Sequence, residues 1–213
     1  ADQKNTGRCK LLVVSGCLSQ RYQEELAGEL PEVDLFVGTA DAPRIVELLD
    51  QGLAGTAPRR AIGPADFLYD HTTPRALSSP FYTAYVKIAE GCANHCSYCV
   101  IPSIRGTLRS RSLASVVAEV EKLVEGGVKE INLIAQDVTA FGADRDDGAN
   151  LITMLKELVK IDGANVLHVM DEVYERGCRT EEEGSSGEGE RGAPQPVRRH
   201  TLGRGRGELR RLA

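Results

Sequence analysis

Residues 90–99 read EGCANHCSYC and hold three of the six cysteines of the chain, Cys92, Cys96 and Cys99. Such crowding of thiols indicates a metal site. A tetrahedral zinc site would need a fourth Cys or His at a matching distance, and no second CxxC or His pair follows. An iron–sulfur cube held entirely by protein takes four cysteines, so three thiolates leave one iron open for another ligand. The sequence therefore favours a 4Fe–4S cluster with one open iron over a disulfide or a structural zinc knuckle.

The surrounding residues carry a resemblance to a known family. The spacing CxxxCxxC, preceded by the strand-like YTAYVKIA at 82–89, resembles the signature of the radical S-adenosylmethionine (SAM) enzymes. The wider block, with CSYCVIPSIRG at 96–106 and RSRS at 109–112, resembles the methylthiotransferase family. The resemblance implies that Cys92, Cys96 and Cys99 hold the cluster and that its open iron binds SAM. Reductive cleavage of SAM then supplies a radical that no side chain can generate.

The resemblance also implies cofactor contacts outside the cysteines, and we assign them to Tyr98, Arg105, Gln136 and Asp137. Arg105, Arg109 and Arg111 are expected to form a basic patch beside the metal, although a solvated loop of charges is the commoner arrangement. Gln136 and Asp137 follow a predicted strand, where β/α barrels carry their functional residues. A capped turn is the alternative for this pair.

Cys17 carries a second resemblance. The residues 15–22, SGCLSQRY, resemble the third-cysteine motif of the methylthiotransferase N-terminal domain. The resemblance implies that Cys17 is one of three ligands of a second, auxiliary 4Fe–4S cluster, whose other two ligands are expected upstream of residue 1. A buried apolar role is the alternative for an isolated cysteine. Cys9 does not match the spacing of the family, and we predict a free thiol there.

Apolar runs and helical periodicity alternate along the chain, which predicts an α/β fold. Strands are predicted at residues 11–14, 34–38, 82–89, 130–135 and 165–170, and helices at 18–30, 41–49, 112–126 and 151–161. Asp41 and Asn150 lie where helix N-caps belong. Residues 52–80, rich in Gly, Pro, Ala, Ser and Thr, are predicted as a linker. His71 within them is expected to be a solvated loop residue, and His168 a wall residue of the barrel.

Three segments follow from this pattern. Residues 1–70 are predicted to be the second half of a methylthiotransferase N-terminal α/β domain with its linker, and 75–170 the first part of a radical SAM (β/α) barrel. Residues 171–213 hold nine Arg, no Lys and eight Gly without apolar periodicity, which predicts a disordered tail. Out-of-frame translation of a GC-rich gene and a genuine interaction tail both remain open for this segment, and Cys178 would be an exposed thiol in it.

Composition sets limits on compartment and partners. The 213 residues are 41% hydrophobic with a net charge of −5, and no apolar run approaches the ~20 residues of a membrane span. No secretory leader is visible, and oxygen-sensitive clusters fit a reducing cytoplasm. The lack of basic excess weighs mildly against RNA binding by this segment. We expect a monomer that needs an electron donor.

The residues after the predicted strand 130–135 discriminate within the family. Ala135-Gln136-Asp137 resembles the branch that modifies a ribosomal protein rather than the transfer-RNA branch. The resemblance implies insertion of a methylthio group at the β-carbon of an aspartate in a small-subunit ribosomal protein, on or off the ribosome. A tRNA adenosine methylthiotransferase and an inactive fragment that binds one cluster are the alternatives.

Overall fold

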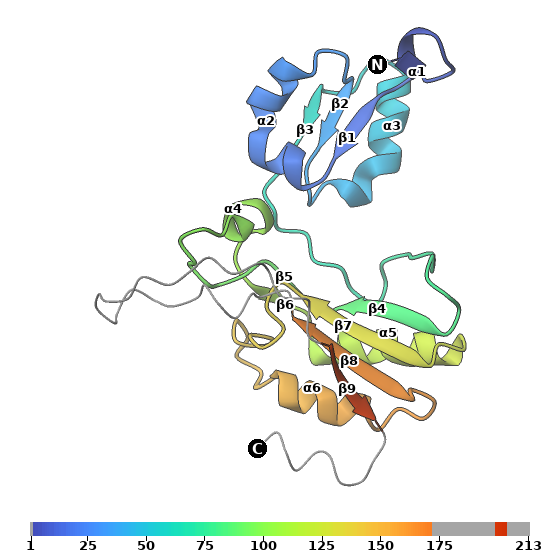
Figure 1. Cartoon of the computed structure of the whole chain (residues 1–213), viewed down its shortest axis with the longest axis vertical. Coiled ribbons are helices and arrows are strands. Elements are labelled where there is room, and N and C mark those ends of the chain that lie inside the picture. The colour runs from blue at the N-terminus through green and yellow to red at the C-terminus, as the bar shows by residue number, and fades with distance from the viewer. Residues whose placement is uncertain (1, 172–198, 204–213) are drawn as a thin grey trace, which may run out of the picture. The chain divides into compact units, whose positions relative to one another are not determined.

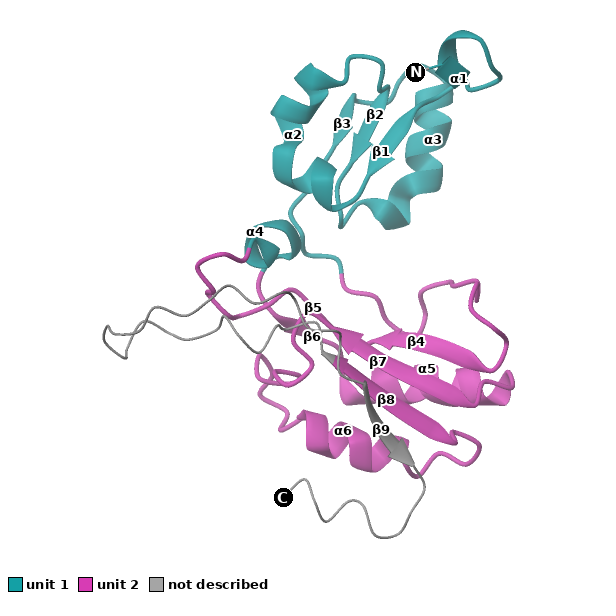
Figure 2. Cartoon of the chain, viewed as in Figure 1, with its two compact units in different colours: residues 1–67, 100–106 teal, residues 68–99, 107–213 magenta. Residues whose placement is uncertain are grey.

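The computed structural model describes residues 2–171 and 199–203. The chain divides into two compact units (Figure 2), and each is described by itself. Unit 1 comprises residues 1–67 and 100–106, and unit 2 comprises residues 68–99 and 107–213. The chain therefore leaves unit 2 directly after Cys99 and returns to it at Thr107. A linear division of the sequence at one linker could not have produced this interleaving.

Unit 1 is built on a small parallel sheet with strand order β1-β2-β3. Its elements are α1 (Asp2–Asn5), β1 (Val13–Ser15), α2 (Cys17–Glu29), β2 (Leu35–Val37), η1 (Ala42–Arg44), α3 (Ile45–Leu53), β3 (Arg60–Ala61) and α4 (Ile101–Arg105). Figure 1 shows α2 and α3 on either side of this sheet. Leu35 and Val37 of the central strand pack against Leu48 of α3, and this apolar cluster is the core of the unit.

One sequence prediction for unit 1 needs correction and another is confirmed in part. The predicted linker contains β3, because Arg60 and Ala61 pair with Phe36 and Val37 of β2. A two-residue strand has no periodicity that a sequence could reveal. Asp41 is the N-cap residue of η1, as predicted, but its side chain makes no cap hydrogen bond. Its carboxylate instead accepts a hydrogen bond from the backbone N–H of Gly63, at 2.7 Å, and so ties β3 to the helix start.

Unit 2 contains a four-stranded sheet of order β4-β7-β8-β9. Its elements are β4 (Thr83–Lys87), β5 (Ala89–Glu90), β6 (Arg109–Ser110), α5 (Leu113–Glu125), β7 (Glu130–Ala135), α6 (Leu151–Leu158), β8 (Val166–Asp171) and β9 (Arg199–Gly203). β4, β7 and β8 are parallel, and β9 is antiparallel to β8. Three parallel strands alternating with α5 and α6 confirm the predicted β/α repeat (Figure 1).

Capping residues mark the starts of α5 and α6 in unit 2. Ser112 caps α5 by accepting a hydrogen bond from the backbone N–H of Ser115 at 3.2 Å. Asn150 forms a reciprocal capping box with Thr153 at the start of α6, as predicted. The buried face of both helices packs on the apolar residues of β4 and β7, which form one continuous core with them.

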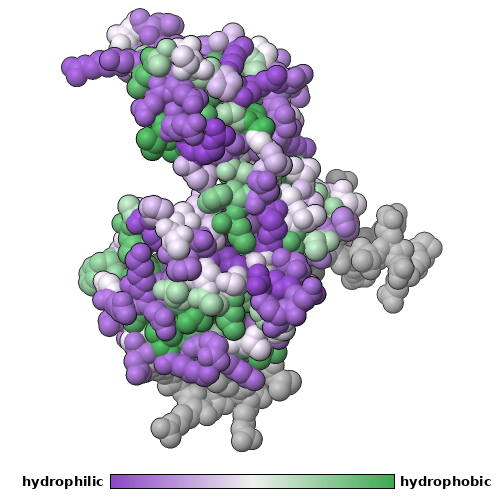
Figure 3. Space-filling model, turned by 180° about the vertical axis from the view of Figure 1, so that it is seen from behind, coloured by the Kyte–Doolittle hydropathy of each residue, from purple (hydrophilic) through white to green (hydrophobic). Residues whose placement is uncertain are grey.

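The surface of the described residues includes several large apolar side chains. Hydrophilic residues cover much of the face seen in Figure 3, with smaller hydrophobic areas between them. The most exposed large apolar side chains come from both units and include Val46, Leu53, Phe81 and Tyr98. Scattered exposure of this kind is ordinary for a folded protein. No helix within the described ranges is long and apolar enough to pass through a membrane.

Candidate metal and cofactor site

The three clustered cysteines lie in a loop that is closed at its base by a short ladder. Ala89 and Glu90 of β5 pair antiparallel with Ser110 and Arg109 of β6. The backbone N–H of Arg111 adds a hydrogen bond to the carbonyl of Ile88, at 2.9 Å. Residues 91–108, which we call the cysteine loop, therefore begin and end at this ladder. We call the ladder, residues 89–90 with 109–110, the neck of the loop.

Two residues beyond the end of β7 hold the first half of this loop. Gln136 accepts a hydrogen bond from the backbone N–H of Gly91, at 2.9 Å through its Oε1. Gly91 has a φ of 76°, a conformation that suits glycine because it lacks a Cβ. The side-chain amide of Asn94 donates to Asp137 Oδ2 at 2.8 Å. The structure thus brings two of the predicted cofactor residues onto the cysteine loop itself.

Asp137 also organises its own turn. Its Oδ1 accepts hydrogen bonds from the Thr139 hydroxyl at 2.7 Å and from the backbone N–H of Ala140 at 3.2 Å. The side chain is buried, with 7% of the residue exposed. This is the capped-turn arrangement, and it coexists with the bond to Asn94. Direct contact of Gln136 or Asp137 with a cofactor stays a prediction.

The thiols of the loop do not form disulfides. Cys92 is buried, and Cys96 and Cys99 are half-buried. The backbone N–H of Asn94 donates to Cys92 Sγ at 3.4 Å, and that of Cys99 donates to the carbonyl of Cys96 at 3.0 Å. N–H donors directed at sulfur and a tight turn between ligands are features that suit an iron–sulfur site.

The donor set fits a cube better than a single ion. Within residues 2–171 and 199–203, no three Cys, His, Asp or Glu side chains converge on one point that could hold one metal ion. Each cysteine of a 4Fe–4S cluster binds a different iron, so its sulfurs need not converge as the ligands of a zinc ion do. Three thiols on one loop match the soft donors that such a cluster takes.

Cys17 lies in unit 1, where it is the exposed first residue of α2. The guanidinium of Arg105 lies against it, with Nη2 at 3.4 Å from Sγ. Arg105 ends the short helix α4, whose Ile104 carbonyl accepts a hydrogen bond from the Thr39 hydroxyl at 3.2 Å. Arg105 was predicted from sequence to contact the cofactor, and the structure places it at the predicted auxiliary-cluster cysteine.

The predicted basic patch is not a surface patch, because Arg111 is only 2% exposed. Its guanidinium forms an ion pair with Glu119 of α5 inside unit 2. Sequence reasoning missed Glu119, although a glutamate on the apolar face of an amphipathic helix, next to Val116, Val120 and Leu123, was a usable signal. Tyr98, in contrast, is exposed.

Other polar residues of unit 2 have partners that sequence reasoning did not anticipate. Lys87, the last residue of β4, forms an ion pair with Glu90, directly before the cysteine loop. His71 is exposed as expected but is not isolated, because its Nδ1 lies 3.2 Å from the Ser115 hydroxyl. His168 is buried on β8, with Nε2 3.0 Å from Glu130 Oε1.

The turn formed by Asp70, Thr72 and Thr73 in unit 2 is expected to have a pH-dependent stability. Hydrogen bonds to Asp70 from the hydroxyl and backbone N–H of Thr72, and then from Thr73, lower the pKa of Asp70 from 3.8 to about 2. The folded state therefore binds fewer protons than the unfolded state between these values. The stabilisation is complete above about pH 4 and is lost as the pH falls through about 2. Asp70→Asn should remove it.

The measurement is the urea midpoint of the apoprotein against pH, for the wild type and for Asp70→Asn. The difference between the two should be constant above about pH 4 and shrink toward zero near pH 2. A difference that does not change with pH would show that the turn does not depend on ionised Asp70.

Comparison with known proteins agrees with this geometry. The Radical SAM superfamily model matches residues 86–180, which include the cysteine loop. Ribosomal protein uS12 methylthiotransferase RimO of Syntrophotalea carbinolica is 64% identical over 160 residues, which are 75% of this chain and 35% of that protein. The protein of the same name from Geobacter sulfurreducens is 58% identical over 163 residues, 76% of this chain and 36% of that protein.

The fold and the cysteine loop define the class: the chain belongs to the radical SAM superfamily. Within that superfamily, it belongs to the methylthiotransferase family of the uS12-modifying relatives. The chain spans about a third of the length of the curated relatives it matches. A solved structure of the radical SAM methyltransferase TsrM from Kitasatospora setae is more distant, with a TM-score of 0.48 and 18% identity over 70% of this chain and 33% of that one. Membership implies a 4Fe–4S cluster and SAM as cofactors.

Proposed function

We propose that this chain serves as part of a methylthiotransferase that modifies ribosomal protein uS12. One observation carries the proposal. The three thiols of the family signature sit on a loop closed by β5 and β6 and held by Gln136 and Asp137, at the carboxyl end of β7. That is the end at which parallel β/α folds place their chemistry. The names of the similar proteins then indicate uS12 as the substrate that accepts the methylthio group.

In this proposal Cys92, Cys96 and Cys99 hold the cluster, and the cluster with SAM supplies the radical chemistry. The side chains do not generate the radical; they orient and shield the group. Gln136 and Asp137 fix the loop that carries the thiols, through the bonds to Gly91 and Asn94. Tyr98 is proposed as a cofactor contact on the resemblance of the stretch CSYC to the family signature.

We further propose that Cys17 is a ligand of an auxiliary cluster. Its exposure, its position at the start of α2 and the adjacent Arg105 guanidinium support this role. The acceptor that we propose is the β-carbon of an aspartate in uS12. The setting is the cytoplasm, the working form is a monomer and a reductant donates the electron.

The test is a substrate comparison under anaerobic conditions. Reconstituted protein with SAM and a reductant is incubated separately with uS12 and with tRNA, and both products are read by mass spectrometry. We expect a methylthio group on a uS12 peptide and none on tRNA. Modified adenosine in tRNA without modified uS12 would assign the chain to the other branch. Formation of 5′-deoxyadenosine without either product would indicate a cluster-binding fragment that lacks the transfer activity.

A further inference from the structure

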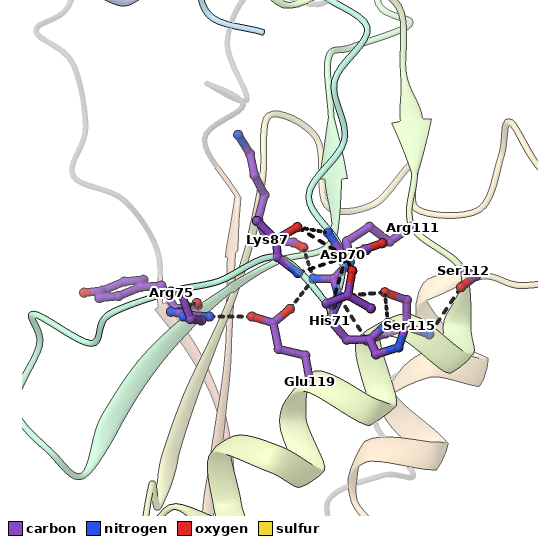
Figure 4. A network of polar contacts seen from close by, with 11 residues as sticks. Asp70, His71, Arg75, Lys87, Arg111, Ser112, Ser115 and Glu119 are labelled. Carbon is purple, nitrogen blue, oxygen red and sulfur yellow. Dashed lines mark hydrogen bonds and ion pairs between the residues drawn. The ribbon is translucent and has the colours of Figure 1, made fainter. Parts of the chain in front are cut away.

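A polar network joins both sides of the neck of the cysteine loop to α5 (Figure 4). Among the described strands, β4 lies at the edge of the sheet, where it pairs with β7. Edge strands direct alternate carbonyls away from the sheet, where they need other donors. The carbonyl of Tyr85 accepts from Arg75 Nη2 at 3.0 Å, and that of Lys87 accepts from Arg111 Nη1 at 2.8 Å.

Arg111 is the residue on which the two sides of the neck meet. Its backbone N–H donates to the carbonyl of Ile88, and its guanidinium donates to the carbonyl of Lys87. It therefore holds two consecutive carbonyls at the outgoing end of β4, directly before β5. It also directly follows β6, the returning side of the loop. One side chain thus adds to a ladder that has only two residue pairs.

Glu119 compensates the buried charge of Arg111. Its two oxygens are shared, one with Arg111 Nη1 and the other with Arg75 Nη1. Arg111 Nη2 also donates to the Ser115 carbonyl at 3.0 Å and to the Ser115 hydroxyl at 2.9 Å. A buried cation that loses its partner is costly, so Glu119 keeps the guanidinium in place.

The network extends to the segment before β4. A guanidinium can only donate, so the Ser115 hydroxyl accepts from Arg111, and its oxygen also lies 3.2 Å from His71 Nδ1. The backbone N–H of His71 also donates to the same hydroxyl, at 3.3 Å. Arg75 and His71 therefore attach this segment to α5 and to the edge of β4.

We propose that Arg111, with Glu119 as its counter-ion, is a positioning residue for the iron–sulfur site. The pair restricts the conformation of the neck, so that the thiols of the cysteine loop are held in one arrangement. A long loop closed by two residue pairs would otherwise keep much of its conformational freedom, and every thiolate ligand must be ordered when a cluster binds. This inference rests on the proposed function only for the identity of the ligand.

Three variants separate positioning from stability. Glu119→Gln leaves Arg111 buried without a counter-ion. Arg111→Lys keeps the charge but cannot reach the carbonyl, the carboxylate and the hydroxyl together. The double variant Arg111→Met with Glu119→Leu replaces the pair by apolar side chains, which can restore stability but leaves the carbonyl of Lys87 without its donor. The control is Glu157→Gln on α6, which removes the exposed ion pair between Glu157 and Lys160.

The first measurement is amide hydrogen exchange in the apoprotein, read on peptides that cover residues 86–95 and 109–112. All three variants should exchange roughly 10-fold faster there, as for loss of one charge-assisted hydrogen bond, and β7 should be unchanged. The second is iron and sulfide bound per chain after anaerobic reconstitution, with the electron paramagnetic resonance spectrum of the reduced cluster. The iron and sulfide content and the spectrum should both be altered in the three variants, and both should be normal in the control.

The double variant decides whether the Arg111–Glu119 pair positions the cysteine loop or only stabilises the fold. We expect its melting temperature to return to the wild-type value or higher while exchange and iron content remain defective. If exchange and iron content recover together with the melting temperature, the network only stabilises the fold and the inference is wrong. If the wild type binds no iron, the proposed function fails. The exchange data on the apoprotein then still decide whether Arg111 orders the loop.

Discussion

Alanine at Cys92, Cys96 or Cys99 is expected to abolish binding of the SAM-binding cluster and formation of 5′-deoxyadenosine. Each thiolate of a three-cysteine cluster binds a separate iron, so loss of one leaves two protein ligands and no other Cys among the described residues of the loop to replace it. Iron content, the visible absorbance of the cluster and 5′-deoxyadenosine are measured in anaerobic preparations. The expected loss is at least about 100-fold in SAM cleavage, as for removal of a directly acting group.

Two other cysteines provide controls. Cys9→Ala should leave iron content and SAM cleavage unchanged, because the Cys9 thiol donates a hydrogen bond to the carbonyl of Leu11, at 3.4 Å, and lies outside the predicted ligand set. Cys17→Ala should preserve SAM cleavage and prevent transfer of the methylthio group. If alanine at Cys92, Cys96 or Cys99 changed neither iron content nor 5′-deoxyadenosine, the cluster assignment would have to be abandoned.

The second large effect is expected at the bond between Asn94 and Asp137. Asp137→Asn can keep the bonds to Thr139 and Ala140 through its amide oxygen, but its NH₂ group then faces the NH₂ group of Asn94. Two donors without an acceptor at a largely buried position cost about 1–3 kcal/mol. We expect this cost to appear as lower iron incorporation and faster amide exchange at residues 91–96.

A charge-neutral exchange of the two side chains provides the decisive control. The double variant Asn94→Asp with Asp137→Asn reverses donor and acceptor and restores the hydrogen bond without changing the net charge. Exchange rates and iron content should return most of the way to wild type. If the single variant behaves like the wild type, the bond does not order the loop. If the double variant recovers exchange but not SAM cleavage, the carboxylate of Asp137 itself contacts the cofactor.

Several features were predictable because their causes lie within a few residues of each other. The spacing of Cys92, Cys96 and Cys99 predicts a cluster from one short stretch. Asn150 stabilises its helix through a residue only three positions away, and the apolar runs of β4, β7 and β8 show themselves as strands. The predicted α/β class and the β/α repeat of unit 2 are confirmed for this reason.

Other features depend on residues far apart in the sequence. Arg105 contacts Cys17 from 88 positions away, and Asp137 contacts Asn94 from 43 positions away. No local pattern distinguishes Arg111, which is buried, from Arg105, which meets a thiol at the surface. β3 is likewise too short to show periodicity, and only its partner strand defines it.

The sequence by itself determined which chemistry is proposed for the chain, because the spacing of thiols within one loop is a local property. Only the tertiary structure decided how that loop is held, by Gln136, Asp137 and the Arg111–Glu119 pair. The physical reason is that a hydrogen bond or a buried ion pair depends on which groups the folded chain brings together. The energy of each contact depends on burial, and burial exists only after the strands and helices have packed.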